Sequence, residues 1–324
     1  MPSLATEPSK PLPVLVLGAG GFIGRHMVAG LAAAGLPVLA GLRRPGKGPA
    51  GVEARLLDAT RPESLAAALD GAGAVVNCVA AEPAAMLDGV RALAQAAGAR
   101  RIVHLSSMAV YGGVTGLVDE SAPLSPDGAY GESKAEAERQ LREHAAAGGE
   151  VVMLRPGCVH GPGSEGWTAR PARLLGAGRL GDLGPGGDGT CNLTAVADLV
   201  GATIAALRRT EAAGEAFNVS DPDPGDWNAY FLHLARAIGA TPLRRIPGWR
   251  LKAEKLAAYP LKVAEIGARR LGVRTPDPIP PSLLRLFGQE ITLDHRRADA
   301  GLGFPRTPPG KAIAEAAAWF LRTA

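Results

Sequence analysis

The sequence predicts an α/β fold: a doubly wound parallel sheet with a smaller C-terminal lobe. Short apolar runs alternate with alanine- and leucine-rich segments through the first third of the chain, and a glycine-rich turn follows the first apolar run. The 324 residues can bury a sizeable core, and the apolar content of 47% is that of an ordinary globular protein. Strands that alternate with helices imply right-handed crossovers and a parallel sheet covered on both faces.

The first elements follow a regular order of strand and helix. Each predicted strand is a run of β-branched and aliphatic residues, and the first predicted helix ends at a glycine, as helices commonly do. The predicted strands are 13–17, 37–42, 53–57, 74–79 and 101–107, and the predicted helices between them include 22–35, 62–70 and 86–98.

From about residue 160 the composition shifts towards glycine and proline. Segments 160–166 and 181–190 are predicted loops, because clusters of glycine and proline interrupt periodic structure. The chain then returns to the predicted sheet at 193–209 and 216–221, and a mixed region follows from residue 222. Loops at the carboxyl edge of such a sheet are where ligands bind in open α/β folds.

Charge and cysteine content limit the classes of function. The 35 basic and 31 acidic residues are interspersed along the chain, so we expect no nucleic-acid partner. Cys78, Cys158 and Cys191 lie too far apart for a zinc motif or a disulfide framework, so we expect reduced thiols and no metal. Residues 1–13 lack the apolar run of a secretory signal, and no segment reaches the roughly 20 apolar residues of a membrane span. We expect a cytoplasmic protein without an integral membrane segment.

The turn GAGGFIG places Gly18, Gly21 and Gly24 directly between a predicted strand and a predicted helix. Glycines with this spacing permit a tight turn, a close approach of the backbone to a pyrophosphate and the packing of helix against strand. The start of the helix adds free N–H groups and a partial positive charge. The motif predicts a Rossmann-type NAD(P) site that includes Phe22 and Ile23, and a glycine turn without a ligand is the alternative.

Residues at the end of the second predicted strand indicate whether the cofactor is NAD or NADP. Sites selective for NAD usually place an acidic residue there, and this chain has Arg43 and Arg44 after Leu42. A guanidinium can pair with the 2′-phosphate, so we expect NADP, with NAD as the alternative cofactor and a solvated basic loop as the alternative structure. Asp58 follows the third strand, where it could bind the adenine amino group or cap the helix that begins near Pro62.

Two further motifs contain polar side chains suited to proton transfer. HLSSMAVYGG, 104–113, has Ser106 and Ser107 at the end of a predicted strand. YGESK places Tyr130 and Lys134 on one face of a helix. A phenol is a poor base at neutral pH, but a neighbouring ammonium favours its ionised form. Tyr130 is therefore a candidate acid/base, although the pair taken alone could be an exposed surface pair.

These motifs, in this order, resemble the extended short-chain dehydrogenase/reductase family, also described as the NAD(P)-dependent epimerase/dehydratase family. It includes nucleotide-sugar epimerases and dehydratases, dihydroflavonol-type reductases and 3β-hydroxysteroid dehydrogenases. The resemblance runs from about Val14 to Phe320, and the segments at 154–163, 187–200 and 217–222 support it. It implies a Rossmann-type fold with a substrate-binding lobe.

The resemblance also implies roles for individual residues. Tyr130 would exchange a proton with a substrate hydroxyl or carbonyl group, and Lys134 would also bind the ribose of the nicotinamide half. Ser107, four residues before Tyr111, would hydrogen-bond the same substrate oxygen, and Ser106 would face the sheet. Asn77 is a further candidate, either in the cofactor pocket or bonded to backbone at a strand end. Other cofactor candidates are Val79 and Pro156. The substrate candidates are Glu82, Met108, His160, Trp167 and Arg170, of which Trp167 and Arg170 could instead form a lid without direct contact.

Two departures from the family bear on the substrate. The connection before 101–107 is short and lacks the N-V-x-G-T-like helix start of nucleotide-sugar epimerases, and Met86 stands where the asparagine is expected. This weakens a sugar-nucleotide interpretation. The basic amphipathic segment 249–272 could form a pocket wall, pack as an ordinary core-facing helix or contact a membrane surface.

The leading hypothesis is an NADP(H)-dependent oxidoreductase that interconverts a ketone or aldehyde and an alcohol. The alternative is a nucleotide-sugar epimerase or dehydratase with tightly held NAD, and a third is a cofactor-sensing protein without catalysis. The expected partner is a small-molecule substrate, and the resemblance implies a homodimer through two helices beside the YGESK helix. The expected division is a flexible leader at 1–13, an NAD(P)-binding domain at 14–160 with returns near 191–220, and a substrate-binding lobe at 161–190 and 221–324.

Overall fold

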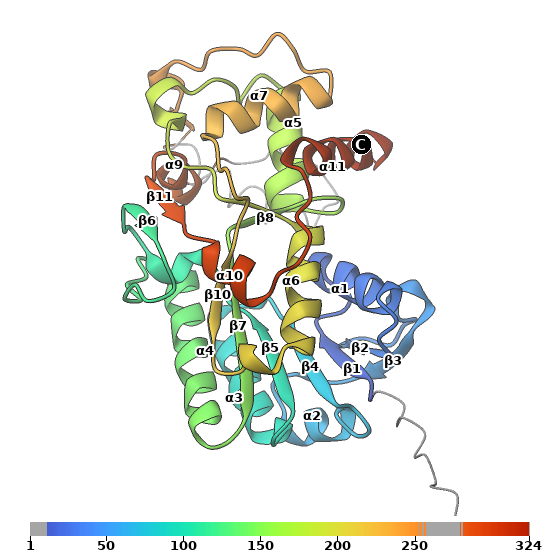
Figure 1. Cartoon of the computed structure of the whole chain (residues 1–324). Coiled ribbons are helices and arrows are strands. Elements are labelled where there is room, and N and C mark those ends of the chain that lie inside the picture. Colours follow the sequence, from blue (N-terminus) through green and yellow to red (C-terminus); the bar gives the residue numbers. More distant parts are fainter. Residues whose placement is uncertain (1–11, 252, 255, 257–278, 280, 324) are drawn as a thin grey trace, which may run out of the picture.

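A computed structural model describes residues 12–251, 253–254, 256, 279 and 281–323 of the chain (Figure 1). Its main sheet has seven parallel strands in the order β10-β7-β5-β4-β1-β2-β3. The predicted α/β fold class is therefore confirmed. The strands are β1 (Val14–Leu17), β2 (Val38–Leu42), β3 (Glu53–Leu56), β4 (Ala74–Asn77), β5 (Arg101–Leu105), β7 (Glu150–Pro156) and β10 (Ala216–Val219).

The central strands are buried on both faces, as parallel strands between two helical layers must be. All four residues of β1 are buried, and β1 pairs in register with β2 on one side and β4 on the other. The strand order reverses at β1, because the chain first builds outward through β2 and β3 and then returns to β4. Ligands in such folds bind at this switch point, beyond the carboxyl ends of the strands.

Helices cover both faces of the sheet (Figure 1). On one face, buried side chains of α1 and α6 pack with the strands in one apolar cluster. On the other face, α2, α3 and α4 contribute a second cluster. The central strands are therefore sandwiched between apolar layers, whereas none of the residues of the edge strand β3 is buried. The bounds are α1 (Phe22–Ala33), α2 (Pro62–Ala68), α3 (Pro83–Ala97), α4 (Ala129–Ala146) and α6 (Val196–Arg208).

A third apolar cluster lies outside the main sheet and is rich in aromatic rings. Trp227, Tyr230 and Phe231 of α7 pack there with Phe287 of α9. In Figure 1 helices α5, α7, α9 and α11 stand above the sheet, so segments that precede and follow α6 in the sequence lie together there. The bounds are α5 (Arg170–Gly176), α7 (Trp227–Ala237), α9 (Pro281–Phe287) and α11 (Pro309–Thr323). Helix α10 (Arg296–Gly301) instead contributes Ala298 to the cluster of α1 and α6.

The structure corrects part of the predicted sheet. The predicted return at 193–209 does not join the main sheet, because β9 (Leu193–Ala195) pairs with β8 (Cys158–His160) in a separate ribbon and α6 follows at once. A second ribbon, β6 (Gly116–Val118) with β11 (Ile291–Leu293), was not predicted. Strands of three residues are too short to show a period in the sequence.

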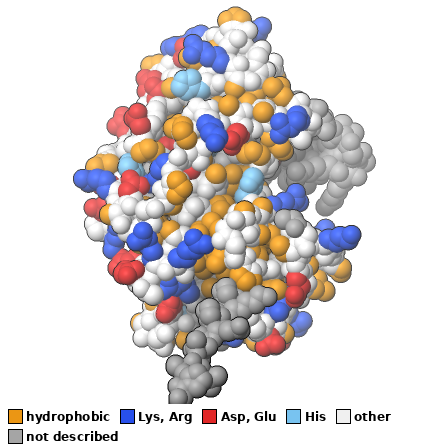
Figure 2. All heavy atoms as spheres, turned by 45° about the vertical axis from the view of Figure 1, so that its right-hand side comes forward, with side chains coloured by type: hydrophobic (Ala, Val, Ile, Leu, Met, Phe, Trp, Pro, Cys, Tyr) orange, Lys and Arg blue, Asp and Glu red, His pale blue; other side chains and the backbone are white. Residues whose placement is uncertain are grey.

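Several predictions concern the surface or the ends of the chain. Most of the predicted leader and the larger part of the basic segment 249–272 lie outside the described residues. Among the helices that are described, none has both the length and the apolar character needed to span a membrane. Figure 2 shows one face of the molecule, on which basic and acidic side chains are intermixed. Within the described ranges, no three metal-ligating side chains come together, and the three cysteines are free thiols.

Candidate active site

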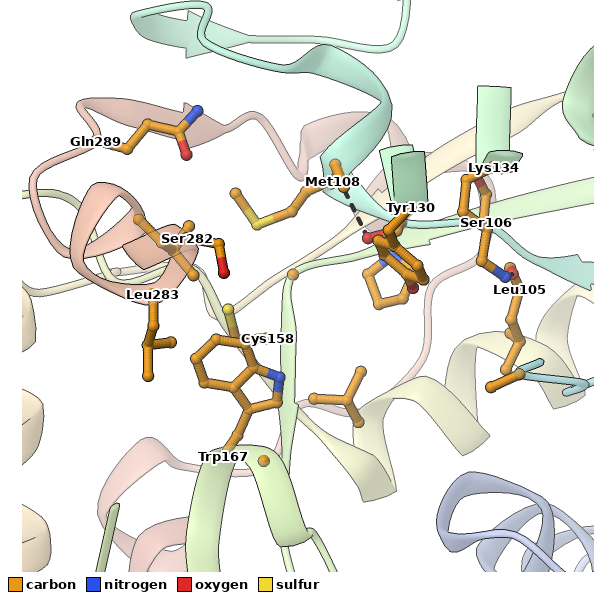
Figure 3. A pocket seen from close by; sticks show the side chains of 18 of the residues that line it. Leu105, Ser106, Met108, Tyr130, Lys134, Cys158, Trp167, Ser282, Leu283 and Gln289 are labelled. Carbon is orange, nitrogen blue, oxygen red and sulfur yellow. Dashed lines mark hydrogen bonds between the residues drawn. The ribbon is translucent and has the colours of Figure 1, made fainter. Parts of the chain in front are cut away.

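A cleft of about 980 Å³ lies beyond the carboxyl ends of the central strands. Figure 3 shows part of it, with the side chain of Tyr130 on one side and those of Trp167 and Leu283 on another. Segments far apart in the sequence therefore meet around one space. The lining includes Phe22 and Ile23 of the glycine turn, Val79, Ser107, Met108 and Pro156 beyond strand ends, Tyr130 and Lys134 of α4, and residues from 164–170 and 282–290.

The glycine turn can be formed only by glycine at two of its positions. Gly18 has a φ of +75°, and a Cβ there would lie 2.9 Å from the carbonyl oxygen of Cys78. A Cβ on Gly24 would lie 2.1 Å from the carbonyl oxygen of Gly18, because the first turn of α1 packs on the loop. The turn thus closes against the end of β4 and opens onto the cleft through Phe22 and Ile23. Such a cradle fits the pyrophosphate of a dinucleotide.

Gly24→Ala is expected to destabilise the protein and to abolish dinucleotide binding. The methyl group collides with backbone rather than with a movable side chain, so the cost is expected near the upper end for overpacking, about 3 kcal/mol in the free energy of unfolding. Gly20→Ala is the matched control, because its Cβ would meet only Leu42 Cδ2 at 3.6 Å. Urea unfolding and cofactor titration of both variants measure the difference. Equal behaviour of the two variants would contradict the prediction.

Arg43 and Arg44 follow β2 directly and are exposed. Asp58 is also exposed, and its carboxylate accepts hydrogen bonds from the backbone N–H of Thr60 at 3.0 Å and from the Thr60 hydroxyl at 2.7 Å. These bonds lower the Asp58 pKa, and the charges of Arg61 and Arg43 add to the effect. The predicted helix cap is wrong, because α2 begins after Arg61 without a side-chain cap and Asp58 instead stabilises a turn.

Ser107, Tyr130 and Lys134 meet between the end of β5 and the first turn of α4. Tyr130 as a whole residue is 54% exposed, because it stands at the cleft, whereas Lys134 is 4% exposed. Lys134 Nζ donates to the carbonyl oxygen of Leu105 at 2.7 Å and lies 6.0 Å from the centroid of the Tyr130 ring. Ser107 Oγ accepts a hydrogen bond from the backbone N–H of Ala109 at 3.2 Å, which caps the helical turn Met108–Tyr111. Tyr130 and Lys134 are therefore not an exposed surface pair, because Lys134 is buried and both residues line the cleft.

The ionisation of the two α4 residues differs from the expectation in one respect. Burial raises the pKa of Tyr130, although a hydrogen bond with Ser107 acts in the opposite direction. Burial also lowers the pKa of Lys134 to about 8, against the opposing effect of Cys78 and Glu138. The expected lowering of the Tyr130 pKa by Lys134 is wrong for the chain alone. The Lys134 ammonium bonds to a carbonyl group, and desolvation is the largest influence on the phenol.

A buried ion pair, Glu138 with Arg155, fixes α4, the helix that carries Tyr130 and Lys134. Arg155 Nε donates to Glu138 Oε1 at 2.9 Å and Arg155 Nη2 to Oε2 at 2.7 Å, in the bidentate geometry of strong ion pairs. Ser106 Oγ donates to the same carboxylate at 2.6 Å, so Ser106 points to α4. Arg155 also donates to the hydroxyl of Tyr111 at 2.8 Å. The pair links β5, α4 and β7.

Sequence reasoning missed the Glu138–Arg155 pair, although one signal for it was present. Glu138 stands four residues after Lys134, so it lies on the same face of α4. Its partner Arg155 belongs to β7, and helix periodicity cannot identify a partner on a strand.

Three of the cofactor candidates now have defined surroundings. Asn77 is buried, its side-chain oxygen accepts from the backbone N–H of Val79 at 3.1 Å, and its amide nitrogen lies 3.2 Å from His104 Nδ1. Of its two alternatives, the structure shows the backbone contact at the strand end. Val79 and Pro156 both line the cleft. Asn77 thus holds the loop that carries Val79.

The substrate candidates divide into two groups. Met108, Trp167 and Arg170 line the cleft. Glu82 is exposed at the start of α3 and is not among the lining residues. His160 is also absent from the lining, because it is fully buried, and burial lowers its pKa to about 4. The structure therefore does not bring Glu82 or His160 to the cleft. Sequence reasoning missed Cys158, Leu283, Leu286 and Gln289, whose spacing carries no chemical signal.

Residues 14–220 match the family described as the NAD dependent epimerase/dehydratase family. The matched range includes the glycine turn, Ser107, Tyr130 and Lys134. The chain belongs to this family. It is thus an enzyme of the extended short-chain dehydrogenase/reductase superfamily, in which NAD(P) is the typical cofactor. The predicted family is confirmed.

Two curated relatives and one solved structure cover most of the chain. The chain is 34% identical over 265 residues to a 3-diazoavenalumate denitrifying reductase of Streptomyces sp, covering 72% of this chain and 84% of the relative. It is 29% identical over 254 residues to a 2-alkyl-3-oxoalkanoate reductase of Stenotrophomonas maltophilia, covering 70% and 76%. MoeE5, solved in complex with UDP-glucose and NAD, aligns with a TM-score of 0.71 and 25% identity over 96% of this chain and 99% of its own.

Proposed function

We propose that the protein is an NADP(H)-dependent oxidoreductase that reduces a ketone or aldehyde, or oxidises the corresponding alcohol. The observation that carries the proposal is the meeting of Ser107, Tyr130 and Lys134 in a cleft that begins at the glycine turn. A protein that only senses a cofactor has no need of this group. Membership of a family of NAD(P)-dependent enzymes supports the proposal.

Each of the three side chains has a distinct task. Tyr130 donates its phenolic proton to the substrate oxygen during reduction and accepts a proton in the reverse direction. Ser107 hydrogen-bonds the same oxygen, and its contact with Tyr130 keeps the two hydroxyl groups adjacent. Lys134 places a positive charge beside the ring and binds ribose hydroxyls of the nicotinamide half. When bound, the nicotinamide supplies or accepts the hydride.

The cofactor would be held from the switch point outwards. Gly18, Gly21 and Gly24 allow the backbone to approach the pyrophosphate, with Phe22 and Ile23 at the start of α1. At the nicotinamide half, Val79 and Pro156 contact the cofactor, and their positions in the cleft support this assignment. At the adenosine half, Arg43 and Arg44 bind the 2′-phosphate and Asp58 binds the adenine amino group.

Net reduction is favoured over a closed redox cycle by two observations. Three curated relatives that each cover 70–72% of the chain are named as reductases. Met86, at the place where an asparagine is typical of nucleotide-sugar epimerases, is buried in α3. The second candidate is a nucleotide-sugar epimerase or dehydratase, which the likeness to MoeE5 favours because that protein was solved with UDP-glucose and NAD.

One experiment separates the two candidates. The protein is purified without added cofactor and denatured, and any released dinucleotide is identified by mass spectrometry. An empty protein that then consumes NADPH with a carbonyl compound from a panel of ketones and aldehydes is the expected result. Stoichiometric NAD in the purified protein, with no NADPH consumption across the panel, would favour the epimerase or dehydratase.

Arg43→Ala is expected to weaken NADP binding about tenfold to a hundredfold while NAD binding changes by less than about twofold, because only NADP carries the 2′-phosphate. Lys47→Ala is the matched control, since Lys47 is an exposed cation of the same loop. Calorimetric titration with both dinucleotides measures the four affinities. Equal losses for NADP and NAD would reduce Arg43 to a general surface charge.

We assign the substrate-binding lobe to 161–190 and 221–324. Its segments 164–170 and 282–290 line the cleft opposite the glycine turn and α4, which supports the assignment. The homodimer, expected through helices beside α4, and the cytoplasmic location stay predictions. Sedimentation of the purified protein measures the first of these directly.

A further inference from the structure

We propose that the substrate carries a planar aromatic group next to its reacting carbonyl, and that Trp167 and Met108 hold this group in the cleft. The inference rests on the proposed function for the identity of the reacting group. It extends that function by naming the chemical class of the substrate. Four features of the cleft carry it: a fixed tryptophan, an apolar surround, a position beside Tyr130, and a mixed set of charges at the remaining lining.

Trp167 forms a rigid, flat part of the cleft wall. Its ring lies against Trp227 with centroids 5.7 Å apart and an angle of 36° between the planes. Its backbone is fixed as well, because its N–H donates to Ser164 Oγ at 3.3 Å and its carbonyl oxygen accepts from the Tyr230 hydroxyl. The ring is half-buried and lines the cleft. One side is therefore covered by protein, and the ring remains available to a ligand on the other.

The support behind Trp167 belongs to the aromatic core. Trp227 is 1% exposed and packs against Phe287 at 4.9 Å and Phe231 at 6.0 Å between ring centroids. A wall held in this way loses little side-chain freedom when a ligand binds, so its contacts contribute to affinity without an ordering cost. An offset or tilted stack of aromatic rings is favourable beyond the area that it buries.

The other side chains that Figure 3 labels around this space are apolar except for Ser282 and Gln289, which are polar but uncharged. Figure 3 shows Met108, Cys158 and Leu283 grouped with Trp167 around the space to one side of Tyr130. Met108 and Cys158 are almost fully buried by protein, and both line the cleft with the little surface they retain. A thioether beside an aromatic ring is a favourable contact. The space next to the proton donor is therefore suited to an uncharged ring.

Charged groups are mixed elsewhere in the cleft. Among the described lining residues other than the α4 lysine, Arg170 and Arg285 are cations, and Asp127, Glu165 and Glu290 are anions. A sugar diphosphate is held by an excess of cationic donors, usually arginines in bidentate contact. The described lining has no such excess. Its charge pattern favours an uncharged aromatic carbonyl compound over a nucleotide sugar.

The test compares two ketones of the same size, acetophenone and cyclohexyl methyl ketone, which differ in the planarity of the ring. Steady-state kinetics with NADPH and calorimetric binding in the presence of NADP are measured on the full chain. Trp167→Leu is expected to raise the KM and the dissociation constant for acetophenone about tenfold while changing those for the saturated ketone by less than about twofold. Trp249→Leu is the matched control, because Trp249 is exposed and does not line the cleft.

A second variant covers the case in which Trp167→Leu disturbs the aromatic core. Leu283→Gln places a polar group on the same space from α9 and is expected to weaken binding of acetophenone about tenfold. Wild-type protein that treats the two ketones equally overturns the inference and leaves the proposed function intact. If acetophenone binds more tightly and depends on Trp167, but NADPH is consumed with no carbonyl compound, the aromatic part of the inference stands and the proposed function fails.

Discussion

Replacing Tyr130 by phenylalanine is expected to lower kcat for carbonyl reduction by about 10³-fold, within the range of about 10² to 10⁴ that general acid–base catalysis contributes. The variant keeps the ring at the cleft and removes only the hydroxyl that exchanges the proton. The affinity for NADPH should stay within about twofold, because the ammonium of Lys134 remains bound to the Leu105 carbonyl group. Turnover numbers and NADPH titrations of the two proteins provide the measurement.

Ser107→Ala is the companion variant, since it leaves the proton donor in place and removes its hydrogen-bond partner. A smaller loss, about tenfold to a hundredfold in kcat, is expected from the absence of one hydrogen bond to the substrate oxygen. Full activity of Tyr130→Phe would end the acid/base assignment. A parallel loss of kcat and NADPH affinity would show instead that the phenol only shapes the cofactor pocket.

The pH dependence of reduction follows from the two shifted groups. Reduction needs the phenol protonated, and the raised pKa of Tyr130 keeps it so well above neutral pH. Lys134 needs its charge, and its pKa of about 8 means that the charge is complete at lower pH and is lost first as the pH rises. The kcat/KM for reduction should therefore be level below about pH 8 and fall above it. A limb that falls towards acid pH would contradict this assignment.

The sequence predicted those parts of the site that depend on local spacing. The glycine turn and the Tyr130 and Lys134 pair follow from strand-to-helix and i, i+4 geometry. In the structure the turn reaches the cleft through Phe22 and Ile23, and Tyr130 and Lys134 line the same cleft. Helix α1 ends at Ala33, close to the predicted glycine. Local spacing was sufficient here because each motif lies within one element or one turn.

Other parts depend on partners that spacing cannot reveal. Asn77 could be placed at a strand end, but its bond to the Val79 N–H and its contact with His104 on β5 depend on strand order. Trp167 and Leu283 meet at the cleft from segments more than a hundred residues apart. The direction of the Tyr130 pKa shift was wrong for the same reason, since desolvation depends on everything that surrounds the group.

Loss of either member of the buried Glu138–Arg155 pair is expected to lower the free energy of unfolding by about 3–5 kcal/mol, because a buried charge loses its bidentate partner. After loss of Arg155, Glu138 keeps only a longer contact of 3.2 Å with Arg142, a half-exposed cation of the same helix. Glu138 is 0% exposed and Arg155 is 1% exposed, so water cannot replace the missing contact. Glu138→Gln and Arg155→Met test the two halves by urea unfolding. Arg139→Met is the control on the same helix, since its bonds to Glu136 and Glu143 are exposed and its loss should change stability little.

The double variant Glu138→Gln with Arg155→Met separates two causes of that loss. If the buried charge that lost its bidentate partner dominates, the double variant should be more stable than Arg155→Met alone, because the buried carboxylate, held only by Arg142, is gone. If the bonds to Ser106 and Tyr111 dominate, the two losses should add. The pair also joins α4 to β5 and β7, the elements whose ends carry Tyr130, Ser107 and Pro156. A single variant that unfolds like the Arg139→Met control would mean that packing alone holds α4 in its register.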